Sequence, residues 1–204
     1  MMLAFFITIR HAVRYYAAYP VLTSLLLTAC MSTPPLPDQQ RPQHWGTVIN
    51  SSHNFHQISQ DVFRSEQPNA QLLPDLEQYE IQTIINLRRR DRDHAMLASS
   101  PYNLVHIPID TWSIDREDLL KVMREIQIAK RNHQRVLIHC YHGSDRTGAS
   151  IAMYRIIFEQ WSIEDALNEM KYGGYGFHPI WINIENLFRP EHIKWIREQL
   201  SNPS

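Results

Sequence analysis

Cys140 and Arg146 are the residues whose types and spacing are best suited to chemistry, because only five residues separate a thiol from a guanidinium. They follow the short apolar run 136–138, which is typical of a buried strand in a parallel sheet. From Arg146 onward, apolar residues recur close to the 3.6-residue period of a helix. The backbone N–H groups of such a strand-to-helix loop point at one spot, where the helix dipole adds partial positive charge. The segment therefore predicts an anion-binding loop.

This loop favours attack on phosphorus by Cys140. A thiol in an electropositive loop at a helix N-terminus ionises more readily than a free cysteine. The planar fork of Arg146 can bind two oxygens of one anion. A tetrahedral phosphate dianion satisfies both groups, so the thiolate would attack it and form a phosphocysteine intermediate. A buried cysteine in an ordinary loop, with a surface arginine, is the structural alternative.

Residues 139–148 resemble the H-C-x5-R-T-G loop of the cysteine-dependent protein tyrosine and dual-specificity phosphatases. Residues 62–88 are similar to the opening of compact atypical dual-specificity phosphatases, which include exported bacterial members. The likeness extends over roughly residues 55–178. It implies an α/β fold with a central, mostly parallel sheet flanked by helices, and with the phosphate-binding loop at a strand-to-helix junction.

Under this resemblance, Arg146 and the backbone N–H groups of the loop hold the equatorial phosphate oxygens as charge develops. The phosphate-binding residues are then Tyr141, His142, Gly143, Ser144, Asp145 and Arg146. His139 is expected to brace the loop, with proton transfer as the alternative. The hydroxyl of Thr147 is expected to hydrogen-bond the thiolate, and a structural place in the first turn of the helix is the alternative.

The leaving alkoxide needs a proton, and three aspartates are candidates for the general acid. Asp110 is preferred, because it lies 30 residues before Cys140 at the end of a predicted strand, which is the spacing of the catalytic aspartate in the family. Asp145 is the second candidate and lies inside the loop, as in myotubularin-like lipid phosphatases. Asp115 is the third, since the N-cap of the following helix also explains it.

The charge of the loop bears on the class of substrate. Phosphatases of highly phosphorylated inositols tend to carry lysines in this loop, whereas residues 141–145 contain none and Asp145 adds a negative charge. A single phosphate ester is therefore favoured, namely phosphotyrosine in proteins, with phosphoserine or phosphothreonine as further substrates. A phosphoinositide or inositol phosphate phosphatase is one alternative, and a catalytically inactive phosphoprotein-binding module is another. A rhodanese-like sulfurtransferase would leave residues 146–148 unexplained.

Composition and charge fit one globular domain. The chain has 204 residues and a formal net charge of −1, so nothing indicates a polyanionic partner such as nucleic acid. Its 11 histidines are scattered, with no H-E-x-x-H motif and no two-cysteine cluster. We therefore expect neither a metal nor another cofactor. The oligomeric state cannot be inferred from the sequence.

Residues 1–29 have the features of a secretory signal peptide: two arginines, no acidic residue and an apolar stretch. The ending Leu-Thr-Ala-Cys resembles a bacterial lipobox, which implies that Cys30 is lipidated. Residues 30–53 are predicted to be this anchor and a proline-rich extended tether, with an ordered arm packed through Trp45 as the alternative. The catalytic domain is expected at 54–204.

The expected location is the periplasmic side of a bacterial membrane, with the lipid anchor in the outer membrane. If residues 1–29 stay uncleaved, they would anchor the chain in the inner membrane instead.

The rest of the chain alternates strands and helices, which independently predicts a mostly parallel sheet with helices on its faces. Strands are predicted at 55–58, 62–64, 81–87 and 104–109, and helices at 69–79, from 116, at 162–170 and within 182–200. The charged run 88–93 is typical of a solvated loop. Because it follows a strand, one of Arg88, Arg89 or Arg90 is a further candidate for attracting an anionic substrate.

Overall fold

The computed structural model describes residues 32–202, which are built around one six-stranded sheet. The strands are β1 (Thr47–Asn50), β2 (Phe55–Gln57), β3 (Val62–Ser65), β4 (Ile81–Asn86), β5 (Asn103–His106) and β6 (Arg135–His139). Their order is β1-β2-β3-β6-β4-β5. Strands β3, β6, β4 and β5 are parallel neighbours, whereas β1 and β2 are added antiparallel at one edge. The predicted mostly parallel sheet is therefore confirmed.

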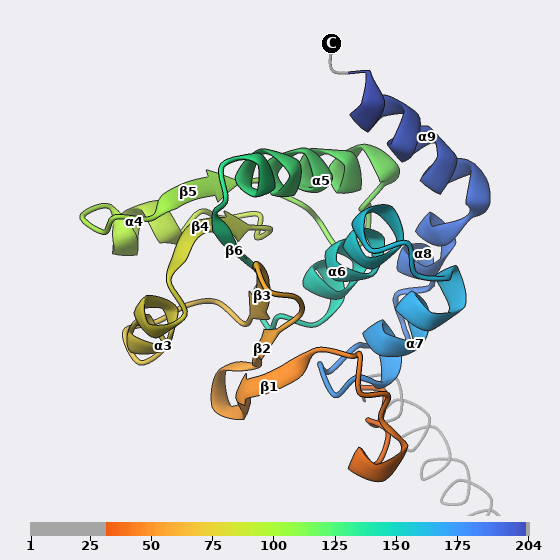
Figure 1. Cartoon of the computed structure of the whole chain (residues 1–204), viewed down its shortest axis with the longest axis horizontal. Coiled ribbons are helices and arrows are strands. Elements are labelled where there is room, and N and C mark those ends of the chain that lie inside the picture. Colours follow the sequence, from red (N-terminus) through yellow and green to blue (C-terminus); the bar gives the residue numbers. More distant parts are fainter. Residues whose placement is uncertain (1–31, 203–204) are drawn as a thin grey trace, which may run out of the picture. The chain divides into compact units, whose positions relative to one another are not determined.

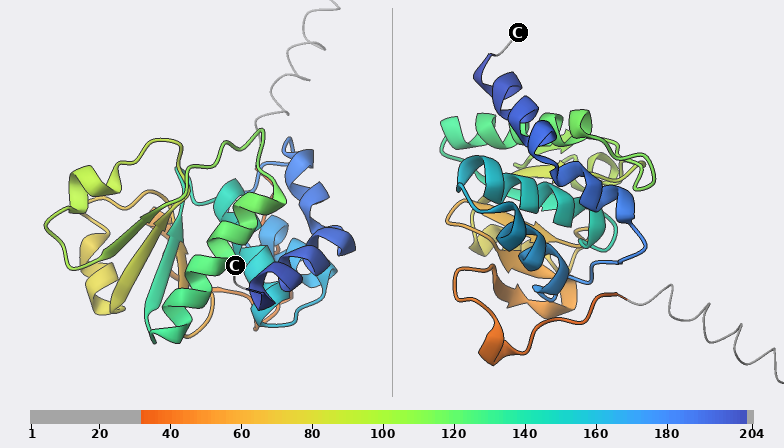
Figure 2. Two further views of the ribbon diagram at one scale, coloured as in Figure 1. Left: turned by 90° about the horizontal axis from the view of Figure 1, so that it is seen from above. Right: turned by 90° about the vertical axis from the view of Figure 1, so that its right-hand side faces the viewer.

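Helices cover both faces of this sheet, as Figure 1 and Figure 2 show from different sides. Two short helices, α3 (Leu73–Gln78) and α4 (Asp93–Leu97), lie on one face. The other face carries α5 (Arg116–Arg131), α6 (Asp145–Phe158), α7 (Ile163–Tyr172), α8 (Ile182–Glu185) and α9 (Pro190–Ser201).

Each face of the sheet has its own hydrophobic core, because successive side chains of a strand point in opposite directions. On β6, Leu137 packs into the core on the α3 side, while Val136 and Ile138 pack into the core beneath α5 and α6. All three side chains are fully buried. This burial on both faces explains the continuous apolar run before Cys140.

Element boundaries differ from the predicted ones where local chemistry intervenes. Helix α3 begins only at Leu73, where Pro74 occupies its first turn, rather than at residue 69. Strand β5 ends at His106, before Pro108, whose nitrogen has no hydrogen to donate to a neighbouring strand. Helix α5 begins as predicted, with Asp115 accepting a hydrogen bond from the Asp118 backbone at 2.9 Å.

The proline-rich segment before β1 is the ordered arm packed through Trp45 that the sequence left as the alternative, and the extended tether preferred within residues 30–53 is wrong for this segment. Backbone N–H groups of Thr33 and Leu36 donate to carbonyls near the end of α7, at 2.7 and 2.9 Å. Trp45 is 5% exposed, and the backbone N–H of Gly46 donates at 2.6 Å to the buried carboxylate of Glu169. Burial of an indole ring and pairing of a buried carboxylate thus hold the arm on the domain.

The signal-peptide prediction for residues 1–29 and the predicted lipidation of Cys30 lie outside the described residues. Within residues 32–202, no helix combines the length and the apolar character that crossing a membrane requires.

Candidate active site

The catalytic loop, residues Cys140–Ser144, joins the end of β6 to the beginning of α6. The carboxyl ends of β3 and β4 flank it, because β6 pairs with both strands in parallel. Cys140 is 2% exposed at the base of this loop. The predicted strand, loop and helix are therefore present in the predicted order, and they place the thiol below the N-terminus of a helix.

Three consecutive carbonyl groups of this loop are held by donors from outside the loop and its helix. The carbonyls of residues 141 to 143 accept hydrogen bonds, in order, from Gln67 N (3.1 Å), Asn54 Nδ2 (2.9 Å) and Arg64 Nη2, and the next carbonyl, of Ser144, accepts the first helical bond of α6. In a trans peptide the C=O and the next N–H point in opposite directions. The N–H groups of residues 142–144 therefore face away from these donors, toward the hollow of the loop.

These inward N–H groups remain available to a ligand. Within residues 32–202, none of the backbone N–H groups of residues 141–146 donates to a protein acceptor. Together with the positive end of α6, they form the anion-binding arrangement predicted for this segment.

Gly143 is required by the turn of the loop. Its φ of +72° is a conformation that side-chain-bearing residues rarely adopt. A Cβ atom at this position would also overlap the backbone carbonyl of Ser65 at the end of β3. Backbone conformation and space therefore both demand glycine here.

Arg64 supports the loop from inside the domain. Its guanidinium is fully buried on β3, where Nη2 donates to the Gly143 carbonyl and lies 3.5 Å from that of Ser144. Nε and Nη1 have no hydrogen-bond partner among the described residues. Burial lowers the pKa of Arg64 from its ordinary value, and the charges of nearby groups, including Tyr175, Glu169 and Cys140, oppose that shift.

The ring of Tyr175 lies 3.7 Å from the Arg64 guanidinium carbon and forms a cation–π contact. Burial and the neighbouring carboxylate of Glu169 raise the pKa of Tyr175 to about 12, so a neutral phenol faces the cation. Sequence reasoning missed Arg64, although a charged residue inside the apolar strand run 62–65 was a signal that it has a special environment.

Asp93 orients the histidine that precedes the nucleophile. His139 is fully buried, and its Nε2 lies 2.7 Å from Asp93 Oδ2. Burial by itself would raise the pKa of Asp93, but hydrogen bonds from His139 and Gln67 and the charges of His139 and Arg88 hold it below its ordinary value. His139 therefore contacts both Asp93 and the backbone of the catalytic loop, which suits the bracing role predicted for it. Sequence reasoning missed Asp93 because it is the last residue of the charged run 88–93, which is typical of a solvated loop.

Arg146 lies at the carboxyl ends of two strands. Its Nη1 donates to the carbonyls of Leu87 and Ile109, at 3.4 and 3.2 Å. These bonds set the plane of a half-buried guanidinium that follows the catalytic loop directly. The hydroxyl of Thr147 is buried and has no partner among the described residues. This leaves it free for the predicted bond to the thiolate.

The three aspartate candidates have different surroundings. Asp110 follows Ile109, whose carbonyl binds Arg146, and its half-exposed carboxylate pairs with Arg89 at 3.0 Å. Asp115 caps α5, so its carboxylate is already engaged. Asp145 accepts hydrogen bonds from the backbone N–H and ring of His178, both at 2.9 Å. Only Asp110 combines proximity to Arg146 with a carboxylate bound by nothing but an exposed ion pair.

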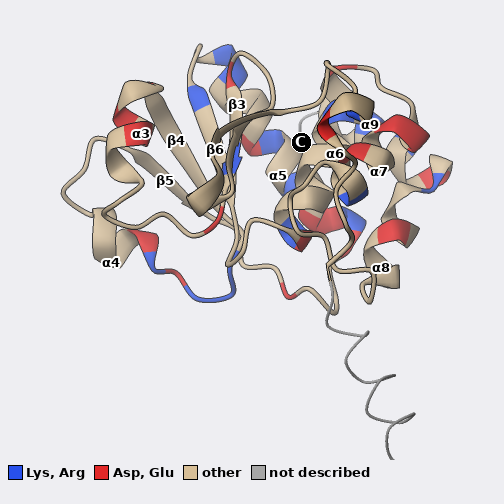
Figure 3. Cartoon of the chain, turned by 90° about the horizontal axis from the view of Figure 1, so that it is seen from below, with Lys and Arg blue, Asp and Glu red and all other residues tan. Residues whose placement is uncertain are grey.

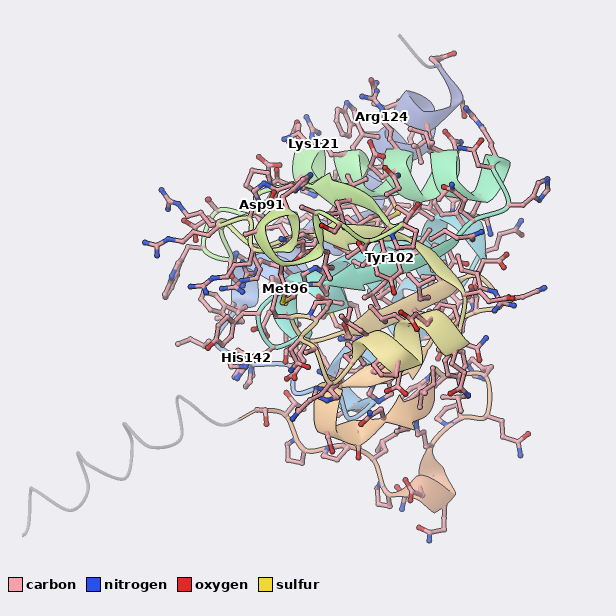
Figure 4. The ribbon with its side chains drawn as sticks, turned by 90° about the vertical axis from the view of Figure 1, so that its left-hand side faces the viewer. Asp91, Met96, Tyr102, Lys121, Arg124 and His142 are labelled. Atoms are coloured by element: carbon pink, nitrogen blue, oxygen red, sulfur yellow. The ribbon has the colours of Figure 1, made fainter. Side chains whose placement is uncertain are left out.

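A basic segment, residues Arg88–Arg92, borders this site between β4 and α4 (Figure 3). Arg88 lies 4.8 Å from the ring of Tyr141, which is 54% exposed. Figure 4 shows Asp91, Met96 and His142 on one side of the domain. The described residues contain no cluster of three or more His, Cys, Asp or Glu side chains suited to a metal ion.

Comparison with known proteins identifies the family to which this site belongs. The family described as dual specificity phosphatase, catalytic domain, matches residues 62–180. The dual specificity protein phosphatase TpbA of Pseudomonas aeruginosa is 35% identical over 136 residues, which cover 67% of this chain. Those residues span 62% of the length of that relative.

Solved structures agree with this match. The crystal structure of P. aeruginosa TpbA aligns with a TM-score of 0.72 at 31% identity and covers 80% of this chain and all of that chain. A variant of TpbA in complex with pTyr aligns with a TM-score of 0.73, covering 80% and 99% of the two chains at 31% identity. DUSP15, at 17% identity, covers 74% and 96% with a TM-score of 0.60 and shares the fold.

Proposed function

We propose that this chain, which belongs to the dual specificity phosphatase family, hydrolyses phosphate monoesters through a phosphocysteine intermediate and acts chiefly on phosphotyrosine in proteins. The observation that carries the proposal is the set of three consecutive loop carbonyls, of residues 141 to 143, held by donors from outside the loop. This arrangement turns consecutive N–H donors toward the position of a phosphate above Cys140.

In the first step, the Cys140 thiolate attacks phosphorus and the bond to the ester oxygen breaks. The inward N–H groups and Arg146 hold the equatorial oxygens as charge develops on them. Asp110 donates a proton to the leaving oxygen. In the second step, water attacks the phosphocysteine, Asp110 accepts the water proton, and phosphate and the thiolate are released.

The preference for a single phosphate ester rests on charge. Residues 141–145 contain no lysine or arginine, and Asp145 adds an acid at the start of α6. A polyphosphorylated inositol would meet no lysine or arginine between Cys140 and Arg146 to offset its additional phosphates. The related TpbA variant was solved in complex with pTyr, which also supports a phosphotyrosine substrate. An inositol phosphate or phosphoinositide remains the alternative substrate class, and a non-catalytic phosphoprotein-binding module the alternative function.

Turnover of p-nitrophenyl phosphate by purified protein tests the catalytic proposal. The wild-type chain should release p-nitrophenol between pH 5 and 8, and Cys140→Ser should abolish the release. Absence of turnover, combined with binding of phosphotyrosine peptides, would support a binding module. Faster turnover of a phosphoinositide than of phosphotyrosine peptides would shift the substrate class.

We also propose that the chain is exported and lipid-anchored through Cys30 on the periplasmic side of a bacterial membrane. The support is the signal-like sequence of residues 1–29 and its Leu-Thr-Ala-Cys ending. Intact-mass analysis of protein from membranes should find a mature chain that begins at a lipid-modified Cys30. A chain that retains residues 1–29 would instead indicate an uncleaved anchor.

A further inference from the structure

Exposed apolar side chains gather at the catalytic end of the domain. The described residues include eight large hydrophobic side chains that are exposed. Four of them, Tyr141, Trp112, Ile180 and Ile182, belong to the catalytic loop or to segments that contact the site. Exposed apolar side chains gathered near one site are typical of a binding region.

Three of these residues form, with Trp181, a surface that we call the apolar rim (Trp112, Ile180, Trp181 and Ile182). The indole rings of Trp112 and Trp181 contact edge to face with centroids 4.5 Å apart. Trp112 is nevertheless 71% exposed, and Ile182 is 69% exposed. These values show that both side chains face solvent.

The rim is fixed in place beside the catalytic loop. Asn183 Nδ2 donates to the Thr111 carbonyl at 2.8 Å and so joins α8 to the segment that follows Asp110. Two residues before Ile180, His178 binds Asp145 at the start of α6. The segment that carries Ile180, Trp181 and Ile182 is therefore tied at one end to the start of α6 and at the other to the residue that follows the preferred general acid.

Charge around the rim selects the kind of partner. The two segments that carry it, residues 110–115 and 178–185, contain no lysine or arginine, and two of their acids, Asp110 and Glu185, are paired with Arg89 and Lys171. A surface without basic side chains of its own offers little to an anionic membrane. The basic segment 88–92 is joined to Asp110 by the Arg89–Asp110 pair. Arg90 and Arg92 there form no ion pair with any described residue. An apolar region and a basic region thus both adjoin Asp110, which Trp112 follows by two residues and with which Arg89 pairs.

We propose that the apolar rim binds an apolar side chain next to the phosphotyrosine of a polypeptide substrate, while the basic segment favours acidic residues on the opposite flank. This inference rests on the proposed function and adds a preference for particular substrate residues beside the phosphotyrosine. A substrate peptide in an extended conformation suits this arrangement. Its successive residues advance by about 3.3 Å, so residues that flank the phosphotyrosine are carried over the surface around the catalytic loop.

Three phosphotyrosine peptides test this inference. One has leucine before and aspartate after the phosphotyrosine, the second has the reverse order, and the third has serine on both sides. One of the two mixed peptides should be hydrolysed with a kcat/KM about threefold to tenfold above that of the serine peptide, a range expected for a partly exposed apolar contact. Equal rates for all three peptides would overturn the inference.

Ile182→Ser should remove this preference and leave the turnover of p-nitrophenyl phosphate unchanged, because that substrate has no flanking residue. Ile128→Ser is the matched control, since Ile128 is 47% exposed on α5, near the end that leads back to the start of β6, away from the catalytic loop. A preference that survives Ile182→Ser, or that Ile128→Ser removes equally, would contradict the proposal.

Two further measurements separate this inference from the proposed function. Peptide affinity measured on the Cys140→Ser protein decides whether the rim binds apolar flanks even if no turnover is found. Sedimentation with vesicles of phosphatidylglycerol and phosphatidylethanolamine should show no binding that depends on Ile182. Vesicle binding lost in Ile182→Ser would assign the rim to a membrane surface instead.

Discussion

The catalytic loop and the segment that carries Asp110 differ in what holds them. Donors from β3, from residues around β2 and from the region before α3 fix the loop carbonyls, and the most central donor, Arg64, is fully buried. Asp110 is held instead by an ion pair with Arg89, whose side chain is 80% exposed. Exposed pairs of this kind contribute little to stability.

This difference separates two tasks of the site. Phosphate binding needs donors whose geometry is set before the substrate arrives, because reorganisation during the reaction would reduce the benefit of each bond. Proton donation needs a carboxylate within hydrogen-bond reach of the leaving oxygen, a contact that is often completed only when the substrate binds. The buried support suits the first task, and the exposed ion pair suits the second.

The largest expected effect comes from the exposed segment that carries Asp110. Asp110→Asn should slow hydrolysis of phenyl phosphate by about 10² to 10³, because a poor leaving group needs a proton from the general acid. Hydrolysis of p-nitrophenyl phosphate should change far less, since its leaving group is stable as the anion. Rates measured across a series of aryl phosphates check this prediction.

Asp115→Asn is the control, because asparagine caps a helix as well as aspartate does and both rates should stay within about twofold. Equal slowing of the two esters by Asp110→Asn would assign the general acid to another residue.

The next largest effect tests Arg64, the buried support of the catalytic loop. Arg64→Met removes the donor to the Gly143 carbonyl. The peptide group that joins Gly143 to Ser144, whose N–H faces the phosphate, then loses its fixed orientation. We expect kcat to fall by about 10², the scale of losing one oriented donor, and vanadate affinity to fall with it. Arg64→Lys should recover part of both.

A surface substitution, Arg131→Met, serves as the control for loss of an arginine. An unchanged kcat in a folded Arg64→Met protein would show that Arg64 serves stability alone and not the geometry of the loop.

A smaller effect concerns stability at mildly acidic pH. His56 is buried next to Tyr175 and Arg64, and burial and the Arg64 charge lower its pKa from 6.5 to about 4. The unfolded chain therefore binds a proton below pH 6.5 that the folded chain binds only near pH 4. The contribution of His56 is complete above pH 6.5 and declines by about 1 kcal/mol per pH unit between these values.

Urea unfolding at pH 7, 6 and 5 should show this decline in the wild-type chain and a flatter dependence in His56→Leu. The same slope in both proteins would mean that other buried groups cause the acid sensitivity.

The smallest effect is expected for Arg89→Gln. Because both partners of its ion pair with Asp110 are exposed, kcat for phenyl phosphate should change by less than about threefold, and high salt should remove even that change. Rates at low and high ionic strength check it. A tenfold loss would show that the pair fixes Asp110 as firmly as the buried donors fix the loop.

Sequence patterns predicted the parts of the site that are local. The apolar run before Cys140, the helix after Arg146 and the Asp115 cap all follow from neighbouring residues, and each is confirmed. The supports of the loop were not predictable in this way. Arg64 and Asp93 lie 76 and 47 residues before Cys140, and only the packing of β3 beside β6 and the start of α4 brings them to it.

The arm shows the same limit. Proline and polar residues predict an extended chain, and nothing within residues 33–46 reveals the buried carboxylate of Glu169 on α7 that binds Gly46. Tertiary contacts with distant residues therefore overrode the local composition.

The most direct test of the account is the identity of the residue that carries phosphate during turnover. Protein mixed with ³²P-labelled phosphotyrosine peptide, quenched in acid within milliseconds and digested, should yield label on the peptide that contains Cys140. Cys140→Ser protein should yield none and should not turn over. Label on any other residue, or continued hydrolysis by Cys140→Ser, would contradict a phosphocysteine formed in the supported loop.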